Sequence, residues 1–178
     1  LNPVKKISAH FVELIRTHEP KTKAKDALTR AKRVLESLGI LPERINDYPH
    51  QFSGGMRQRI MIGLAIALNP DLVIADEPTT ALDVIVQQKT LDLLEGLRKV
   101  YGMALILISH DLSIILERCD KIIVLYAGQI FEYASSMELH MAPNVPEVTT
   151  STSFAATSTP LLSTSLIIFS AVNTTASP

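Results

Sequence analysis

The sequence predicts an α/β fold built around parallel strands. Two short runs, residues 71–76 and 103–108, have the continuous hydrophobicity of strands buried on both faces. Residues 84–101 lie between them and place apolar side chains at helical spacing. Polar residues end both runs, at the strand ends where open α/β sheets bind ligands. A ligand site is therefore expected at this edge of the sheet.

The chain before residue 48 is predicted to be helical. Residues 5–18 and 22–38 repeat apolar side chains at helical spacing, and Gly39 follows as a candidate C-cap. Amphipathic helices need a surface on which to pack. The pattern does not tell whether these two simply cover a core.

Ser53-Gly54-Gly55 opens the next predicted helix, which runs into the apolar residues 60–68. Pro49 favours an extended entry to it. Serine is a good N-cap, and a helix N-terminus offers free backbone N–H groups and partial positive charge. Glycines let that backbone approach a ligand closely. The stretch fits a phosphate site, although an ordinary capped helix after a turn would show the same sequence pattern.

Caps and turn residues predict the remaining boundaries. Asn69-Pro70 ends the helix that Ser53 begins, and Gly102 ends the helix of residues 84–101. Asp83 and Asp111 are candidate N-caps of residues 84–101 and 112–118. A hairpin over 121–126 and 129–133 turns at Ala127-Gly128, and residues 135–142 form a short helix.

Composition excludes several classes of function. The 178 residues are enough for one domain, and the net charge of −1 provides no broad basic field for nucleic acid. The basic residues of 21–25 and 30–33 are interpreted as a solvated helix face. Cys119, the single cysteine, excludes an intramolecular disulfide and a cysteine-only metal site. The chain has no signal peptide and does not open with Met, so we expect a fragment.

Four motifs in fixed order resemble those of the ATP-binding cassette (ABC) ATPases. They are Phe52-Ser53-Gly54-Gly55-Met56-Arg57-Gln58-Arg59, Asp76-Glu77-Pro78, Ala81-Leu82-Asp83 and Ser109-His110-Asp111. The resemblance covers roughly residues 1–142. The Gly-Gly-Met-Arg-Gln form and the stretch 126–133 look most like the branch that imports oligopeptides, dipeptides or nickel chelates. The resemblance implies a P-loop NTPase-type parallel sheet flanked by helices, with a helical subdomain.

The resemblance also assigns roles to residues. ATP and Mg²⁺ would be the cofactors, with Asp76 holding Mg²⁺ through water. Glu77 would be the general base for the attacking water, and His110 would contact the γ-phosphate. Ser53, Gly54, Gly55 and Gln58 would bind ATP held by a second subunit. Asp83 would lie in the loop that crosses the dimer interface, and this role is compatible with capping.

One part of the family pattern is missing. No Gly-x-x-x-x-Gly-Lys-Ser/Thr phosphate loop occurs in the sequence, so that loop and the N-terminal β-subdomain are expected to be absent. The predicted divisions are 1–48, part of the helical subdomain; 49–142, the motif-bearing core; and 143–178, a tail. The chain alone is expected to bind ATP weakly and hydrolyse it poorly.

The tail differs from the rest in composition. Residues 148–178 contain no charge and are rich in Ser and Thr. Residues 154–172 are long enough to span a bilayer, but Pro160 and many hydroxyls argue against a membrane helix. Low-complexity disorder is the prediction. A shifted reading frame or a truncated gene product is the open alternative.

The resemblance thus implies an ATP-hydrolysing importer subunit, with expectations for its partners and its location. Its partners would be integral membrane permease subunits and a second ABC ATPase subunit, in a homo- or heterodimer, with no nucleic acid. Its place would be peripheral, on the cytoplasmic face of the cell membrane. The alternatives are a soluble ABC ATPase without a transport role and an incomplete, non-catalytic fragment.

Overall fold

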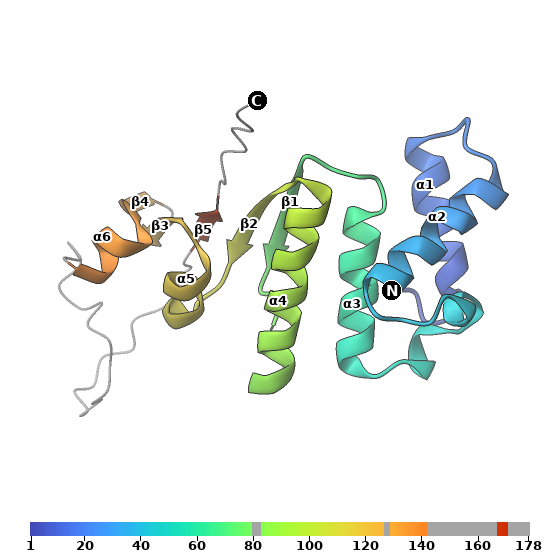
Figure 1. The fold of residues 1–178 in the computed structure, drawn as a ribbon, viewed down its shortest axis with the longest axis horizontal. Coiled ribbons are helices and arrows are strands. Elements are labelled where there is room, and N and C mark those ends of the chain that lie inside the picture. The colour runs from blue at the N-terminus through green and yellow to red at the C-terminus, as the bar shows by residue number, and fades with distance from the viewer. Residues whose placement is uncertain (80–82, 127–128, 142–166, 171–178) are drawn as a thin grey trace. The chain divides into compact units, whose positions relative to one another are not determined.

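A computed structural model of the chain describes residues 1–79, 83–126, 129–141 and 167–170. The chain forms two compact units. One comprises Leu1–Val73 with Thr79–Met103, and the other comprises Ile74–Pro78 with Ala104–Pro178. Figure 1 shows the elements of each. The predicted divisions at 48/49 and 142/143 stay predictions.

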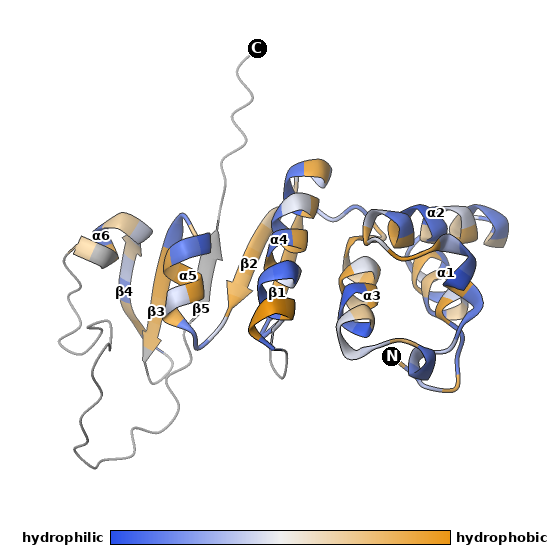
Figure 2. Ribbon diagram, turned by 60° about the horizontal axis from the view of Figure 1, so that its bottom comes forward, coloured by the Kyte–Doolittle hydropathy of each residue, from blue (hydrophilic) through white to orange (hydrophobic). Residues whose placement is uncertain are grey.

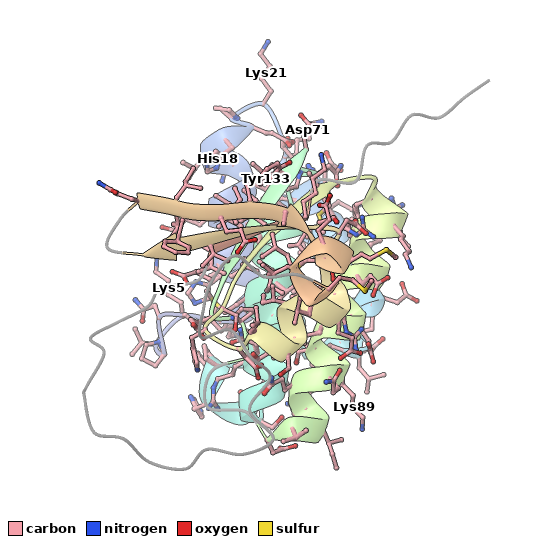
Figure 3. All side chains as sticks on the ribbon, turned by 90° about the vertical axis from the view of Figure 1, so that its left-hand side faces the viewer. Lys5, His18, Lys21, Asp71, Lys89 and Tyr133 are labelled. Carbon is pink, nitrogen blue, oxygen red and sulfur yellow. The ribbon has the colours of Figure 1, made fainter. Side chains whose placement is uncertain are left out.

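The first unit is helical, as its apolar periodicity predicts. Its elements are α1 (Ile7–His18), α2 (Ala24–Ser37), the short 3₁₀ helices η1 (Pro42–Asn46) and η2 (Pro49–Gln51), α3 (Gly54–Ile66) and α4 (Val84–Tyr101). Figure 2 shows a hydrophobic and a hydrophilic side on α1 and α2. Lys21, in the predicted solvated cluster, is exposed and projects outward (Figure 3).

The core of this unit is packed around a glycine. Ile7, Phe11 and Ile15 of α1 are fully buried, as are Ala31 and Leu35 of α2. A Cβ atom placed on Gly63 of α3 would lie 2.6 Å from Leu38 Cδ1 and 3.3 Å from Phe11 Cζ. Because real Cβ contacts are longer than the first of these, the backbone of α3 lies directly against the side chains of the helical hairpin.

The second unit is a sheet with two short helices. Its strand order is β1-β2-β5-β3-β4. The elements are β1 (Leu72–Asp76), β2 (Ala104–Ile108), α5 (Leu112–Arg118), β3 (Lys121–Tyr126), β4 (Gln129–Ser135), α6 (Ser136–Met141) and β5 (Ile167–Ser170). β1 begins in the first unit and ends in the second.

The strand directions confirm the α/β prediction. β1 and β2 run the same way (Figure 1), and β2 and β3 are each antiparallel to β5, so they are parallel to one another. β3 and β4 form the predicted antiparallel hairpin, with an irregularity between Val124 and Leu125. Its turn, Ala127-Gly128, lies outside the described residues.

β5 departs from the expectation of a disordered tail. Residues 167–170, Ile-Ile-Phe-Ser, pair within the sheet, and their β-branched and aromatic residues have high strand propensity. The rest of residues 143–178 lies outside the described residues, where disorder stays a prediction. In the described part of the chain, no helix has the length and hydropathy needed to cross a membrane.

The packing at Gly63 yields a stability prediction. We expect Gly63→Val to lower the free energy of unfolding by about 1–3 kcal/mol, because added methyl groups have no room beside Leu38 and Phe11. Gly96 in α4 is the control, since its Cβ would meet nothing within 4 Å. Gly96→Ala should raise stability by roughly 0.5–1 kcal/mol. Urea denaturation followed by circular dichroism measures both, and equal effects would contradict the packing argument.

Candidate functional site

Glu77 and His110 form a pair at the carboxyl ends of two neighbouring strands. Glu77 follows β1, and its backbone N–H donates to the carbonyl of Ile108, the last residue of β2, at 2.9 Å. Its Oε1 atom accepts a 3.1 Å hydrogen bond from the His110 backbone N–H. The same oxygen lies 2.7 Å from His110 Nδ1. The structure therefore brings together the predicted base and the predicted phosphate-contacting histidine.

The backbone at Glu77 is unusual. Its φ of +45° lies in the left-handed region, which costs a non-glycine residue roughly 1–2 kcal/mol. The hydrogen bonds to Ile108 and His110 accompany this conformation. Such strain persists where the surroundings over-determine it, and it clusters at functional sites. The conformation turns the carboxylate toward His110.

The pair is electrostatically coupled and open to solvent. The hydrogen bond that the His110 ring donates to Glu77, and then the negative charge of Glu77, raises the pKa of His110 above 6.5, and the charge of Asp111 adds to the effect. Partial desolvation opposes the shift. The His110 side chain is 74% exposed and that of Glu77 is 35% exposed. A protonated His110 can thus offer its charge and a hydrogen bond to an anion.

Residues around His110 hold its turn in place. Ser109 is buried, and its hydroxyl accepts a 3.1 Å hydrogen bond from the Asp111 N–H. Asp111 is the predicted N-cap of α5 and accepts from Ser113 N–H at 3.0 Å. These short-range bonds fix where β2 ends and α5 begins. His110 is therefore presented at a defined position beside Glu77.

Asp76, the predicted Mg²⁺ ligand, is the last residue of β1 and is exposed. Mg²⁺ commonly takes one or two carboxylates and completes its shell with water and phosphate oxygens. Among the described residues, no group of three His, Cys, Asp or Glu side chains could hold a metal ion. Asp76 thus fits the single-carboxylate mode that accompanies a nucleotide, and it does not fit a metal cage made by protein alone.

The predicted phosphate-binding stretch begins α3 as expected. Ser53 is the N-cap, and its Oγ accepts a 3.3 Å hydrogen bond from Met56 N–H. A Cβ on Gly54 would meet nothing within 4 Å, whereas one on Gly55 would lie 3.1 Å from Val86 Cγ1. Packing therefore accounts for Gly55 and leaves the space at Gly54 open to solvent. Gln58 is half-buried on the same helix.

Asp83 caps α4 and belongs to the same neighbourhood as Gly55. It accepts a 3.0 Å hydrogen bond from the N–H of Val86. Because Val86 also lies against Gly55, the N-terminal turns of α3 and α4 are side by side, as Figure 1 shows. Ser53, Gly54, Gly55 and Asp83 thus gather within the first unit, while Asp76, Glu77 and His110 gather within the second. Residues 80–82 lie outside the described residues.

Arg44 is a residue that the sequence reasoning missed. Its Nε lies 2.8 Å from Asp47 Oδ2, and a terminal nitrogen donates to the Gln51 carbonyl at 3.0 Å. Its guanidinium also stands 4.1 Å from the centre of the Phe52 ring. Arg44 thereby ties together the segment that leads into Ser53. No motif spacing pointed to it; the Arg44–Asp47 interval of three residues was the sole available signal.

Comparisons with known proteins identify the family of the chain. The sequence profile of the ABC transporter family matches residues 3–80. The oligopeptide transport ATP-binding protein OppD of Bacillus subtilis is 45% identical over 148 residues, covering 82% of this chain and 41% of that protein. The dipeptide transport ATP-binding protein DppD of Haemophilus influenzae is 48% identical over 148 residues, covering 82% and 44%.

A solved structure shares the fold. The ATP-binding cassette MJ0796, a dimer in a post-hydrolysis state bound to ADP and Pi, is 28% identical and matches with a TM-score of 0.63. The match covers 76% of this chain and 59% of that one. The chain belongs to the ABC transporter family.

Within the family, both sequence relatives are ATP-binding proteins of peptide transport, which is the branch that the Gly54-Gly55-Met56 stretch indicates. The chain spans less than half the length of either relative.

The Glu77–His110 contact predicts a titration. Glu77→Gln should lower the pKa of His110 toward 6.5, because the hydrogen bond and the charge that favour the protonated ring are weakened or lost. A raised folded-state pKa stabilises the fold below the unfolded pKa, and this stability is lost as pH rises through the folded value. The stability difference between the two proteins should therefore shrink toward high pH.

Proton NMR titration of the His110 ring measures the shift. Asp111→Asn is the matched control, since Asp111 is the smallest cause of the raised pKa. It should lower the pKa of His110 by less than Glu77→Gln does. An unchanged pKa in Glu77→Gln, or equal shifts in both variants, would contradict the assigned pairing.

Proposed function

We propose that this chain carries the water-activating and signature-motif portions of an ABC importer's ATP-hydrolysing subunit. The observation that carries the proposal is the Glu77–His110 pair at the ends of β1 and β2. Parallel-sheet proteins bind ligands at this edge. The similarity to ATP-binding proteins of peptide transport supports the same function.

Each acidic or basic group has a distinct task in this proposal. Glu77 is the general base that accepts a proton from the attacking water. His110 hydrogen-bonds the Glu77 carboxylate in the structure and offers its ring to a phosphate oxygen. Asp76 is the residue that would hold Mg²⁺. When bound, Mg²⁺–ATP would supply the phosphoryl group, and the metal would neutralise charge on the phosphate oxygens.

The α3 N-terminus would serve the nucleotide site of a second subunit. Ser53, Gly54 and the free N–H groups of the first turn form a positively polarised end that suits phosphate. Gln58 lies further along the same helix, and Asp83 begins the adjacent α4. The matching structure, MJ0796, is a dimer, and this supports an arrangement with two ATPase subunits. The partner would be an identical or related ATPase chain.

The transported substrate and the membrane partners follow from the relatives. Oligopeptides or dipeptides are the proposed substrates, because the relatives are named for their transport. Integral membrane permease subunits would complete the importer, and the chain would bind them peripherally at the cytoplasmic face of the membrane. The family match favours this assignment over a soluble ABC ATPase without a transport role.

A second candidate function rests on a specific observation. The 178 residues contain no Gly-x-x-x-x-Gly-Lys-Ser/Thr loop, which elsewhere cradles the β- and γ-phosphates. A chain without such a loop acts as a non-catalytic fragment unless another segment supplies it. The two candidates differ in a measurable way, because a supplied loop should restore turnover only if the remaining site is intact.

We expect the isolated 178-residue chain to show no cassette-like ATP turnover. A chimera in which the residues preceding the matched segment of Bacillus subtilis OppD are joined to Leu1 should hydrolyse ATP. In that chimera, Glu77→Gln should reduce kcat by about 10²–10⁴-fold while ATP still binds. Phosphate release and nucleotide-binding assays test this. Full turnover by the isolated chain, or by the Glu77→Gln chimera, would refute the assigned roles.

Gly54 provides an independent test of the signature stretch. Gly54→Ala should leave the urea midpoint of the 178-residue chain within the range of surface substitutions, because its Cβ meets nothing. In the chimera it should lower kcat/KM at least about tenfold by obstructing phosphate, an effect of about 1.4 kcal/mol. Gly96→Ala, on open helix surface, should leave kcat/KM unchanged. Equal kinetics for both alanine variants would argue against a ligand at Gly54.

A further inference from the structure

We propose that a polar cavity beside α2 binds a short peptide with a free amino terminus and a free carboxyl terminus. The cavity has a volume of about 510 Å³, which is within the usual range for small-molecule sites. It is lined by one face of α2, by Asn69 after the end of α3 and by Tyr101 at the end of α4, all within the first unit. We call it the α2 cavity. It shares no residue with the candidate functional site, so the inference does not depend on the proposed ATPase function.

One face of α2 supplies the charged wall of the α2 cavity. Asp26, Thr29, Arg30 and Arg33 are spaced three, four and seven residues apart, which places them on the same side of the helix. Arg30 already has a partner, because its guanidinium donates a 2.8 Å hydrogen bond to Glu19 Oε1. Its positive charge is therefore compensated within the protein.

Asp26 and Arg33 carry the charges that a ligand can meet. Both are exposed, and in the described part of the chain neither side chain has an ion-pair or hydrogen-bond partner. A purely anionic ligand would meet the charge of Asp26, and a purely cationic one would meet that of Arg33. A ligand that carries both charges, one at each end, satisfies the two residues together.

The spacing of these two charges matches a tripeptide. Asp26 and Arg33 are seven residues apart in α2, so their Cα atoms are separated by about 10.5 Å along the helix axis. An extended chain advances about 3.3–3.6 Å per residue, and three residues therefore span about 10–11 Å. The protonated amino terminus would lie at Asp26, and the terminal carboxylate would lie at the guanidinium of Arg33.

The remaining residues of the α2 cavity suit the middle of a peptide. Asn69 has an amide that both donates and accepts hydrogen bonds, as a peptide unit requires of its partner. The Thr29 hydroxyl donates to the Lys25 carbonyl at 3.0 Å and keeps lone pairs for a ligand N–H. Val34, which is 4% exposed, and the half-buried Tyr101 add apolar surface for small side chains.

A titration of the 178-residue chain with trialanine tests the proposal. Amide NMR spectra should show saturable shifts in α2 and at Asn69 and Tyr101. N-acetyl-trialanine and trialanine amide each lack one terminal charge. Both should bind about three- to tenfold more weakly than trialanine, because each loses one exposed charge pair.

Two substitutions assign the ends of the peptide. Asp26→Asn should weaken trialanine binding by about the same factor and should no longer distinguish trialanine from its N-acetyl form. Arg33→Gln should no longer distinguish trialanine from its amide. The matched controls are Glu36→Gln and Lys32→Gln, which are exposed on α2 outside the cavity and should leave the Kd unchanged. Circular dichroism confirms that all four variants keep the helix content of the parent chain.

Four outcomes would overturn the proposal. The first is the absence of saturable trialanine binding to the parent chain. The second is an equal loss of affinity in the cavity variants and in the controls. The third is equal binding of trialanine and its N-acetyl form. The fourth is binding of inorganic phosphate as tight as that of trialanine, since this would leave only an anion site at Arg33.

Discussion

The pairing requirement of β2 is the constraint on which the second unit depends. A strand buried on both faces has to place its backbone polar groups in ladders on both edges. At the edge of β2 that faces β1, the Glu77 N–H donates a hydrogen bond to the Ile108 carbonyl. This bond fixes the ends of the two strands relative to each other. At the other edge of β2, residues 167–170 provide the pairing partners. One apolar strand thereby organises both the candidate site and the closure of the sheet.

The candidate site lies where the ends of β1 and β2 meet. β1 ends in Asp76, and the backbone then turns through a left-handed Glu77. This turn sets the carboxylate against His110 at a distance at which hydrogen bonding and charge raise the pKa of the ring. The carboxylate of Glu77 and the ring of His110 are thus held together within one unit and remain accessible to solvent. Catalysis of phosphoryl transfer depends mainly on charged and hydrogen-bonding groups that the protein holds in position before the reaction.

The first unit builds its part of the site on a different physical basis. Here two capped helix N-termini lie side by side, with Val86 packed near Gly55. Capping by Ser53 and Asp83 leaves further N–H groups of each first turn without intrahelical partners. The close approach uses the missing side chain of Gly55, while Gly54 remains free of any packing role. Arg44 orders the segment that enters this region through contacts with Asp47, Gln51 and Phe52.

The sequence by itself predicted the α-helices and strands before residue 142 and the identity of the candidate site residues, but it did not predict β5. Caps such as Ser53, Asp83 and Asp111, and stops such as Gly102, act within a few residues, so local chemistry specifies them. The continuous apolar runs likewise predicted β1 and β2 as strands. The expected burial on both faces holds for β2 but is wrong for β1, where Leu72 and Ile74 are exposed. The roles in catalysis and binding stay predictions for all the candidate site residues, which are Ser53, Gly54, Gly55, Gln58, Asp76, Glu77, Asp83 and His110.

Only the tertiary structure decided three things. It set the left-handed conformation of Glu77, the convergence of Arg44 on Phe52 and the insertion of residues 167–170 between β2 and β3. Each depends on partners that are distant in sequence or on a backbone angle that no residue type dictates. Hydrophobic periodicity specifies that a strand has to be paired, but it does not specify which segment of the chain will pair with it.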